Sequence, residues 1–324
     1  MISLRVLASL CLLIGPGIAG SHAQEPYPNR TVRIVVPTSP GGVTDVLARM
    51  VGQGMSTASG TPVVVVNRPG GDAVIGLNSV AKSENDGYTL LVSSDAAFTA
   101  GPHLHSQKLY DTLKDFTPIL VLGQITPVLC VPASLPAHSV AEFIALAKAN
   151  PGTMNYASFG VGTYAHLGME DFKKRTDANI LHVPYKGSAP ATVALLRGEV
   201  SAMIVNLNVI AHHAQTGTVR IIAAAGSSRS AFRPDLPTIA ESGVPGFATG
   251  AWWGLFGPAN LSAAVVDKIQ RDVAAYLLTP EALKFFEINT IEPVHKTPDQ
   301  FAKLIRDDYE HWGSLIKAVG VTHD

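Results

Sequence analysis

The chain has 324 residues, 47% of them hydrophobic and 15% charged, which is typical of a globular protein of about two domains and excludes a disordered or fibrous one. Its 24 basic and 25 acidic residues give a formal net charge of −1 without a basic stripe. Charge therefore gives no reason to expect nucleic acid or an anionic membrane as a partner.

The N-terminus has the pattern of a secretory signal peptide. Arg5 precedes the apolar run 6–14, a Gly-Pro-Gly break follows at 15–17, and Ser21-His22-Ala23 fits a cleavage site. A membrane anchor would need about 20 apolar residues, and the break comes too early for that. We therefore predict a signal peptide at residues 1–23 and export to the periplasm. Its removal takes Cys11 and leaves Cys130, so no internal disulfide is expected.

Residues 32–50 read as a strand, a turn and a helix. Ile34, Val35 and Val36 are typical of a buried strand, and the proline and glycine residues of 37–42 end it. From Thr44 onward the apolar residues recur at helical spacing. A glycine turn at a helix N-terminus leaves backbone N–H groups without partners and so suits an anion. The alternative is a plain strand-to-helix connection whose N–H groups are met by water and by Asp45.

The rest of the chain alternates short apolar runs with helical patterns. Strands are expected at 62–67, 88–92, 154–157, 180–183, 200–205 and 219–225. Helices are expected at 73–82, 140–149, 164–174, from Ala189 to Gly198, at 238–242, and from Ala263 onward, including 301–319. The run 116–132 is too long for one strand and predicts two strands with a hinge near 123–127.

This alternation predicts parallel sheets whose ligands bind beyond the carboxyl ends of the strands. Gly41, Gly42 and the polar residues 93–95 would then share one rim. A second strand, glycine turn and helix N-terminus follows at 154–174, with the turn at Ser158–Thr163. Its spacing is not the dinucleotide fingerprint, since Ala165 occupies the third glycine position, and the chain has no P-loop. The loop 184–188 precedes a third helix.

Several stretches in this order resemble the periplasmic solute receptors of the tripartite tricarboxylate transporter family, also called Bug-type receptors. The resemblance is carried by segments spread over the mature chain: Ile34-Val35-Val36-Pro37, Pro40-Gly41-Gly42-Val43-Thr44-Asp45, Asn67-Arg68-Pro69-Gly70, Asp86-Gly87-Tyr88-Thr89-Leu90-Leu91, Asn155-Tyr156-Ala157-Ser158 and His182-Val183-Pro184-Tyr185-Lys186-Gly187-Ser188-Ala189-Pro190.

The resemblance implies a type II periplasmic binding fold, an α/β architecture of two doubly wound lobes joined by two crossing segments. We expect lobe 1 to comprise 24–124 and 253–324, and lobe 2 to comprise 125–252. It also implies a monomeric receptor, not an enzyme, that closes on a small carboxylate (a dicarboxylate, an acidic amino acid or an aromatic carboxylate) and hands it to a membrane permease. No cofactor and no metal is implied.

The ligand-binding residues expected from this reading follow the ends of the predicted strands: Thr38, Ser39, Gly41, Gly42, Thr44, Asp45, Ser94, Asp95, Ser158, Gly160, Gly162, Thr163, His166, Tyr185, Lys186, Gly187 and Asn206. The chain departs from the family pattern near this site. Thr38-Ser39 replaces a Phe-Pro pair, Val205 stands where an aspartate is common, and Asp95 adds an acid, so the ligand's identity is open.

A metal site and an exported hydrolase have less support in the sequence. His103, His105 and the pair His212-His213 have no trusted metal-ligand spacing. An exported hydrolase would need a nucleophile such as Ser158 or Ser188, but there is no G-x-S-x-G motif.

Individual side chains also keep alternative roles. His166 is the candidate base, with a capping or packing role as the alternative. Asp45 can bind a ligand ammonium or stabilise its own helix. Lys186 can pair with a carboxylate or lie in solvent, and Trp252 and Trp253 can fill a hinge or core or stack on a ligand. A periplasmic sensor that presents the same ligand to a signalling partner remains the main alternative function.

Overall fold

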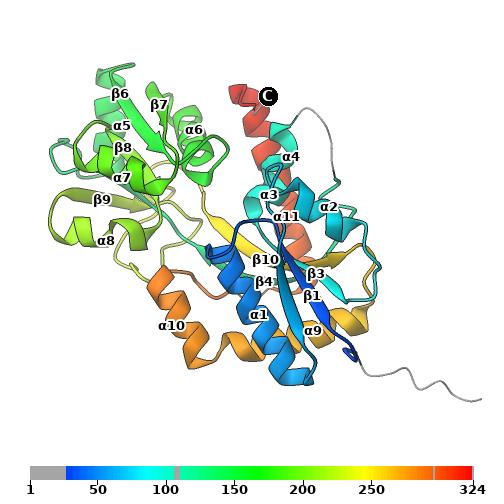
Figure 1. Cartoon of the computed structure of the whole chain (residues 1–324). Helices are drawn as coiled ribbons and strands as arrows, with labels where there is room; N and C mark the ends of the chain where they lie inside the picture. Colours follow the sequence, from blue (N-terminus) through cyan, green and yellow to red (C-terminus); the bar gives the residue numbers. More distant parts are fainter. Residues whose placement is uncertain (1–26, 106–109, 295, 323–324) are drawn as a thin grey trace, which may run out of the picture.

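The computed structural model describes residues 27–322 except 106–109 and 295, so the predicted signal peptide lies outside the described residues. Two five-stranded sheets, each flanked by helices, form two lobes that lie side by side (Figure 1). This confirms the predicted two-lobed α/β fold. In the described part of the chain no helix is long and apolar enough to cross a membrane.

The first lobe is built on a sheet of strand order β2-β1-β3-β10-β4. Its strands are β1 (Val32–Val36), β2 (Val63–Asn67), β3 (Thr89–Ser94), β4 (Phe116–Ile125) and β10 (Ala251–Pro258). Its helices are α1 (Val43–Ser59), α2 (Val74–Ala81), α3 (Asp95–Thr99), α4 (Gly101–Leu104), α9 (Ala263–Leu277), α10 (Pro280–Asn289) and α11 (Pro298–Val319).

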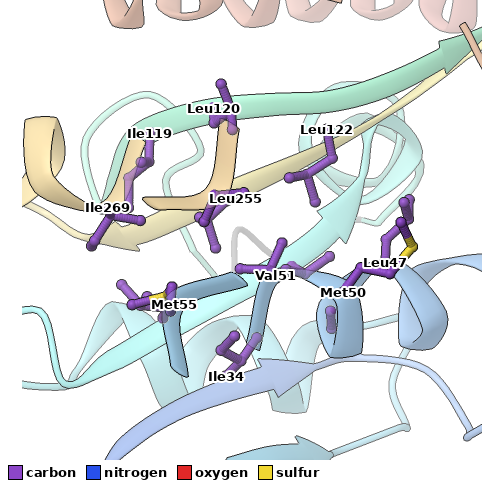
Figure 2. Close-up of a cluster of buried hydrophobic side chains, with 14 of the residues drawn as sticks. Ile34, Leu47, Met50, Val51, Met55, Ile119, Leu120, Leu122, Leu255 and Ile269 are labelled. Atoms are coloured by element: carbon purple, nitrogen blue, oxygen red, sulfur yellow. The ribbon is translucent and has the colours of Figure 1, made fainter. Parts of the chain in front are cut away.

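Helix α1 packs its apolar face onto this sheet. Leu47, Met50 and Val51 follow the helical repeat and meet Ile34 of β1 and Leu255 of β10 (Figure 2). Burying a Leu, Val or Met side chain contributes roughly 1.5–3 kcal/mol, so this face holds the helix in place. The N-terminus of α1 is thereby fixed at the carboxyl end of β1.

The second lobe has the strand order β7-β6-β8-β5-β9. Its strands are β5 (Val128–Pro132), β6 (Met154–Ser158), β7 (Ile180–Pro184), β8 (Ala202–Val205) and β9 (Val219–Ala224). Its helices are α5 (Val140–Ala149), α6 (Tyr164–Thr176), α7 (Ser188–Leu196) and α8 (Leu207–Gln215).

The predicted parallel pairing is confirmed for β1 with β2 and β3 and for β6 with β7 and β8, but each sheet is mixed. Strand β10 runs antiparallel to both β3 and β4, and β5 runs antiparallel to both β8 and β9. Each of these two strands begins where the chain has just crossed from the other lobe, and it enters its sheet against the direction of its neighbours. The expected helical piece at 238–242 is reduced to turns, one of which is closed by a hydrogen bond from Ser242 N to Thr238 O of 3.0 Å, and no separate helix is assigned there.

The two crossings touch each other between the lobes. The first runs through Thr126 and Pro127, between β4 and β5, which confirms the predicted break in 116–132. The second passes through Gly250, where an added Cβ would lie 2.7 Å from the Ile125 carbonyl oxygen. The residues that follow Gly250 form β10, a strand inside the first sheet.

Candidate functional site

Two adjoining cavities lie between the lobes. The inner cavity, of about 280 Å³, is lined by Thr44, Ser94 and Asp95 from the first lobe and by Thr163 and Tyr164 from the second, among others. The outer cavity, of about 530 Å³, shares Ser94 and Thr163 with it and extends to the loop before α2. Together they form the interlobe cleft.

The turn before α1 forms one wall of this cleft. Gly42 is the N-cap of α1 and has no capping side chain, and an added Cβ there would have no atom within 4 Å. The N–H groups of the first helical turn have no partner within the helix. The Thr44 hydroxyl, which lines the inner cavity, accepts a 3.1 Å hydrogen bond from Trp253 Nε1 of β10. This turn therefore offers backbone donors and a braced hydroxyl on the cleft side.

Asp45 has a different role from the one expected of a ligand-binding residue. Its carboxylate accepts from Gly41 N at 3.0 Å, from Arg49 Nε and Nη2 at 3.1 Å each, and from Asn67 Nδ2 at 3.0 Å. Burial opposes its charge, but these hydrogen bonds hold the pKa of Asp45 below its usual value. The side chain is 4% exposed. Asp45 thus organises the turn, and the Gly41 N–H is already used within it.

In the second lobe, the turn between β6 and α6 faces the cleft. Gly162 and Thr163 line both cavities, and Thr163 is the N-cap of α6. The Thr163 hydroxyl donates to the Gly160 carbonyl oxygen at 2.7 Å. The Gly162 N–H donates to Nδ1 of the buried His166 at 3.1 Å. Because that nitrogen accepts from the backbone, His166 holds the turn from behind.

Ser158 lies beneath this turn. Its hydroxyl is 2.7 Å from Nε2 of His182, a pairing that the sequence did not predict, since His166 was the expected base. The His182 ring is stacked between those of Tyr156 and His166, and burial lowers its pKa. A nucleophile must be reachable by its substrate, but Ser158 is fully buried. The pair therefore anchors the turn instead of facing the cleft.

Asp95 lies at the junction of the lobes and is 8% exposed. It lines the inner cavity and also a smaller one of about 120 Å³ behind the second crossing, which we call the hinge cavity. Its carboxylate is hydrogen-bonded by the backbone of Ala96 and Trp252. Burial, and next the charge of Asp308, raise the pKa of Asp95 to about 8. Burial likewise raises the pKa of Asp308, which accepts from Trp252 Nε1 at 2.8 Å, to about 6.

Aromatic side chains that the sequence analysis did not select also line the inner cavity. Phe159 and Tyr164 come from the second lobe, and their rings meet edge to face at 5.1 Å. Trp253 comes from β10 and Trp312 from α11. Phe159 lies inside the glycine turn at 158–163, so its position in the sequence was enough to predict it as a site residue. Nothing in the sequence around Trp312 indicated a place in the cavity, because the helical spacing there predicts only a helix that covers the lobe.

The remaining predicted residues are not gathered at the cavities. The Tyr185 N–H donates to Ser158 O at 2.9 Å, and the Tyr185 side chain packs against the second lobe's core. Lys186 is exposed beside Gly187. Asn206 caps α8 and contacts the end of α10 through Asn289 O at 3.1 Å. The residues of the prediction that line the cleft cavities are Thr38, Ser39, Thr44, Ser94, Asp95, Gly162 and Thr163.

The chemistry of the inner cavity follows from its lining. No Lys, Arg or His is among the described residues that line it. An anion there would be held by uncharged donors: backbone N–H groups, hydroxyl groups, indole N–H groups and water. Among the described residues, no three His, Cys, Asp or Glu side chains are grouped as metal ligands.

The chain matches a known family over most of its length. Residues 47–321 match the family model described as "Tripartite tricarboxylate transporter family receptor". The protein BugT of Bordetella pertussis is 36% identical over 318 residues, which is 98% of each chain.

Two solved structures with bound acids are similar. One, from R. palustris with adipate, is 33% identical, covers 91% of this chain and 99% of its own, and has a TM-score of 0.73. The other is MatC from Rhodopseudomonas palustris with bound malate, at 28% identity, 90% and 100% coverage and a TM-score of 0.70. Sequence and fold agree over nearly the whole length, and the chain therefore belongs to the tripartite tricarboxylate transporter receptor family.

Proposed function

We propose that this protein is a periplasmic solute-binding receptor that captures a small organic carboxylate between its lobes and delivers it to a membrane permease, without catalysing a reaction. The observation that carries the proposal is the inner cavity, where the first turns of α1 and α6 meet and no basic side chain lies among the described lining. Helix N-termini bind carboxylates through their free N–H groups.

The relatives support the ligand class. Two similar structures hold adipate and malate, which are both carboxylates. The export signal read from residues 1–23 supports the periplasmic location. A buried Ser158 speaks against hydrolysis, because no substrate can reach its hydroxyl without opening the turn.

Thermal unfolding with a panel of organic acids tests the binding step. A ligand that binds only the folded protein stabilises it by RT ln(1 + [L]/Kd), roughly 2.7 kcal/mol at a hundredfold excess over Kd. We expect at least one small carboxylate to raise the melting temperature in proportion to the logarithm of its concentration. A panel of acids without effect, next to a clear shift from a neutral sugar or a metal ion, would contradict the proposal.

Delivery to a permease needs a second measurement. Deleting the gene should abolish cellular uptake of the acid that stabilises the protein, and a plasmid copy should restore it. If uptake persists while a transcriptional response to the acid is lost, the protein is a sensor instead of a transport receptor.

A further inference from the structure

The inner cavity carries a buried acid that a receptor for anions does not need. Asp95 lines this cavity with 8% of its surface exposed, and no Lys, Arg or His of the described chain forms an ion pair with it. Its charged neighbour is Asp308, another acid, on the other side of Trp252. A buried carboxylate is normally paired with a cation, so the missing partner is a feature to be explained.

The surroundings of Asp95 favour a positive group in the cavity. Tyr164 lines the same cavity from the second lobe. Burial and the charge of Asp95 raise the pKa of that phenol, while a hydrogen bond with the backbone of Asn206 lowers it. Trp253, Phe159 and Trp312 add aromatic surface to the same lining. Aromatic faces attract cations and gain nothing from a second anion. A cation beside Asp95 would therefore gain from the ionised carboxylate and from the aromatic surface, and a negative group would gain from neither.

We propose that the ligand of this receptor is a small zwitterion, whose carboxylate is bound at the α1 and α6 turns and whose cationic nitrogen lies against Asp95. The inference rests on the proposed function, since it assumes that a carboxylate enters the cleft. Within that class it selects amino acids and related ammonium acids, and it disfavours dicarboxylates. A second carboxylate beside Asp95 would either keep that side chain protonated or meet its charge, and the described lining has no basic side chain to neutralise either acid.

Acids that differ only in one end group measure this preference. In the first series, 4-aminobutyrate, glutarate and pentanoate end in an ammonium, a carboxylate and a methyl group. In the second series, 4-(aminomethyl)benzoate, 4-(carboxymethyl)benzoate and 4-ethylbenzoate carry the same three end groups on a benzoate ring. The α-amino acids join the panel with their deaminated counterparts. By calorimetry at pH 7 we expect the zwitterion of a binding set to bind at least about tenfold more tightly than its dianion.

Asp95→Asn tests the residue itself. The amide keeps an oxygen that accepts from the backbone of Ala96 and Trp252 but removes the charge. We expect it to lower the affinity for the zwitterion about tenfold or more and to leave the affinity for the neutral-ended acid unchanged. Asp235→Asn is the matched control, because Asp235 is an exposed acid that pairs with Arg233 and lines neither cleft cavity. It should not weaken zwitterion binding.

Proton release separates a charge contact from a structural role. With a pKa of about 8, Asp95 is mostly protonated in the free protein at pH 7, and a cation beside it would ionise it. Zwitterion binding should then release up to about one proton, read from calorimetry in buffers of different ionisation enthalpy. Asp95→Asn should release none.

The outcomes separate the two proposals. If no organic acid binds, the receptor function itself fails. If acids bind but the dianion or the neutral-ended acid has the same affinity as its zwitterion, this inference is overturned. It is also overturned if only acids without a cationic nitrogen bind. The same holds if the dianion binds best without proton release, because a neutral Asp95 would then be donating a hydrogen bond to a second carboxylate.

Discussion

The carboxylate of Asp45 shows how one side chain can shape a site without facing it. It accepts from Gly41 N, from Arg49 and from Asn67, so it ties the turn before α1 to the helix and to the end of β2. Asn67 also donates to Thr38 O at 3.0 Å, which extends the network to the start of the turn. The backbone donors of the first helical turn, where Val43 and Thr44 line the inner cavity, are thereby held in place.

Asp45→Ala should therefore destabilise the first lobe by about 1–3 kcal/mol at pH 7, because it leaves several donors without their acceptor. The folded pKa of Asp45 is lowered, so its stabilisation is complete above the unfolded pKa of about 3.9 and is lost as pH falls through the lower folded value. Urea unfolding at pH 7 and pH 3 should show a large difference between parent and variant at pH 7 and a small one at pH 3.

The control for this experiment is Asp235→Ala. Asp235 is exposed and pairs with Arg233 on the surface, so its removal should leave the midpoint unchanged. Equal midpoints for the parent and Asp45→Ala at pH 7 would show that the network does not stabilise the fold.

At the scale of elements, the cleft is made by two units of the same kind, a strand, a glycine turn and a helix N-terminus. The unit of β1 and α1 belongs to the first sheet and that of β6 and α6 to the second. Each helix begins at a residue whose side chain does not cap it, Gly42 in one case and Thr163 in the other. Both N-termini therefore keep backbone donors for a ligand or for water.

Gly42→Val should abolish most carboxylate binding while the protein still folds. The φ of Gly42 is −80°, which valine adopts without strain, and an added Cβ has no atom within 4 Å, so the fold tolerates the change. The side chain would fill the approach to the free N–H groups, and we expect an affinity loss of roughly tenfold or more by calorimetry.

Ala58→Val adds a similar bulk at an exposed position near the other end of α1 and should bind as the parent does. Far-ultraviolet circular dichroism should be the same for all three proteins. Unchanged affinity in Gly42→Val would mean that the carboxylate is not held at this turn.

For the whole molecule, the arrangement of the two crossings decides how the lobes can move. Thr126-Pro127 and Gly250 are the short links between the sheets, and they lie against each other. Gln124 and Glu292 exchange backbone hydrogen bonds of 3.0 and 2.7 Å beside them. Rotation about this narrow strip leaves both cores intact, as hinge motions in two-lobed binding proteins do.

Ligand binding should therefore reduce the radius of gyration measured by small-angle scattering. The lobes would rotate as rigid bodies and close the cleft over the bound acid. The protein should first be unfolded and refolded, so that no acid from the cell remains in the cleft. An unchanged radius at saturating ligand would argue against closure.

Local sequence patterns were sufficient for most elements and for the general place of the site. Helix α5 was predicted with its observed ends, since Val140–Ala149 has a serine N-cap and a clear helical repeat. The glycine turns at 41–42 and 158–163 were found because glycine and proline act over a few residues. The pairing of β10 between β3 and β4 was missed, because it joins residues far apart in the chain and its direction depends on the second crossing.

The sequence by itself determined the family, the two-lobed α/β fold and the glycine turns, because these depend on short segments read in order. Only the tertiary structure decided what each polar residue does. In that structure Asp45 accepts hydrogen bonds within its own turn, and Ser158 pairs with His182. Asp95 lies in the cleft near Trp252 and Asp308. The reason is physical: whether a buried carboxylate has donors or cations around it depends on neighbours brought from distant elements, and no local pattern encodes them.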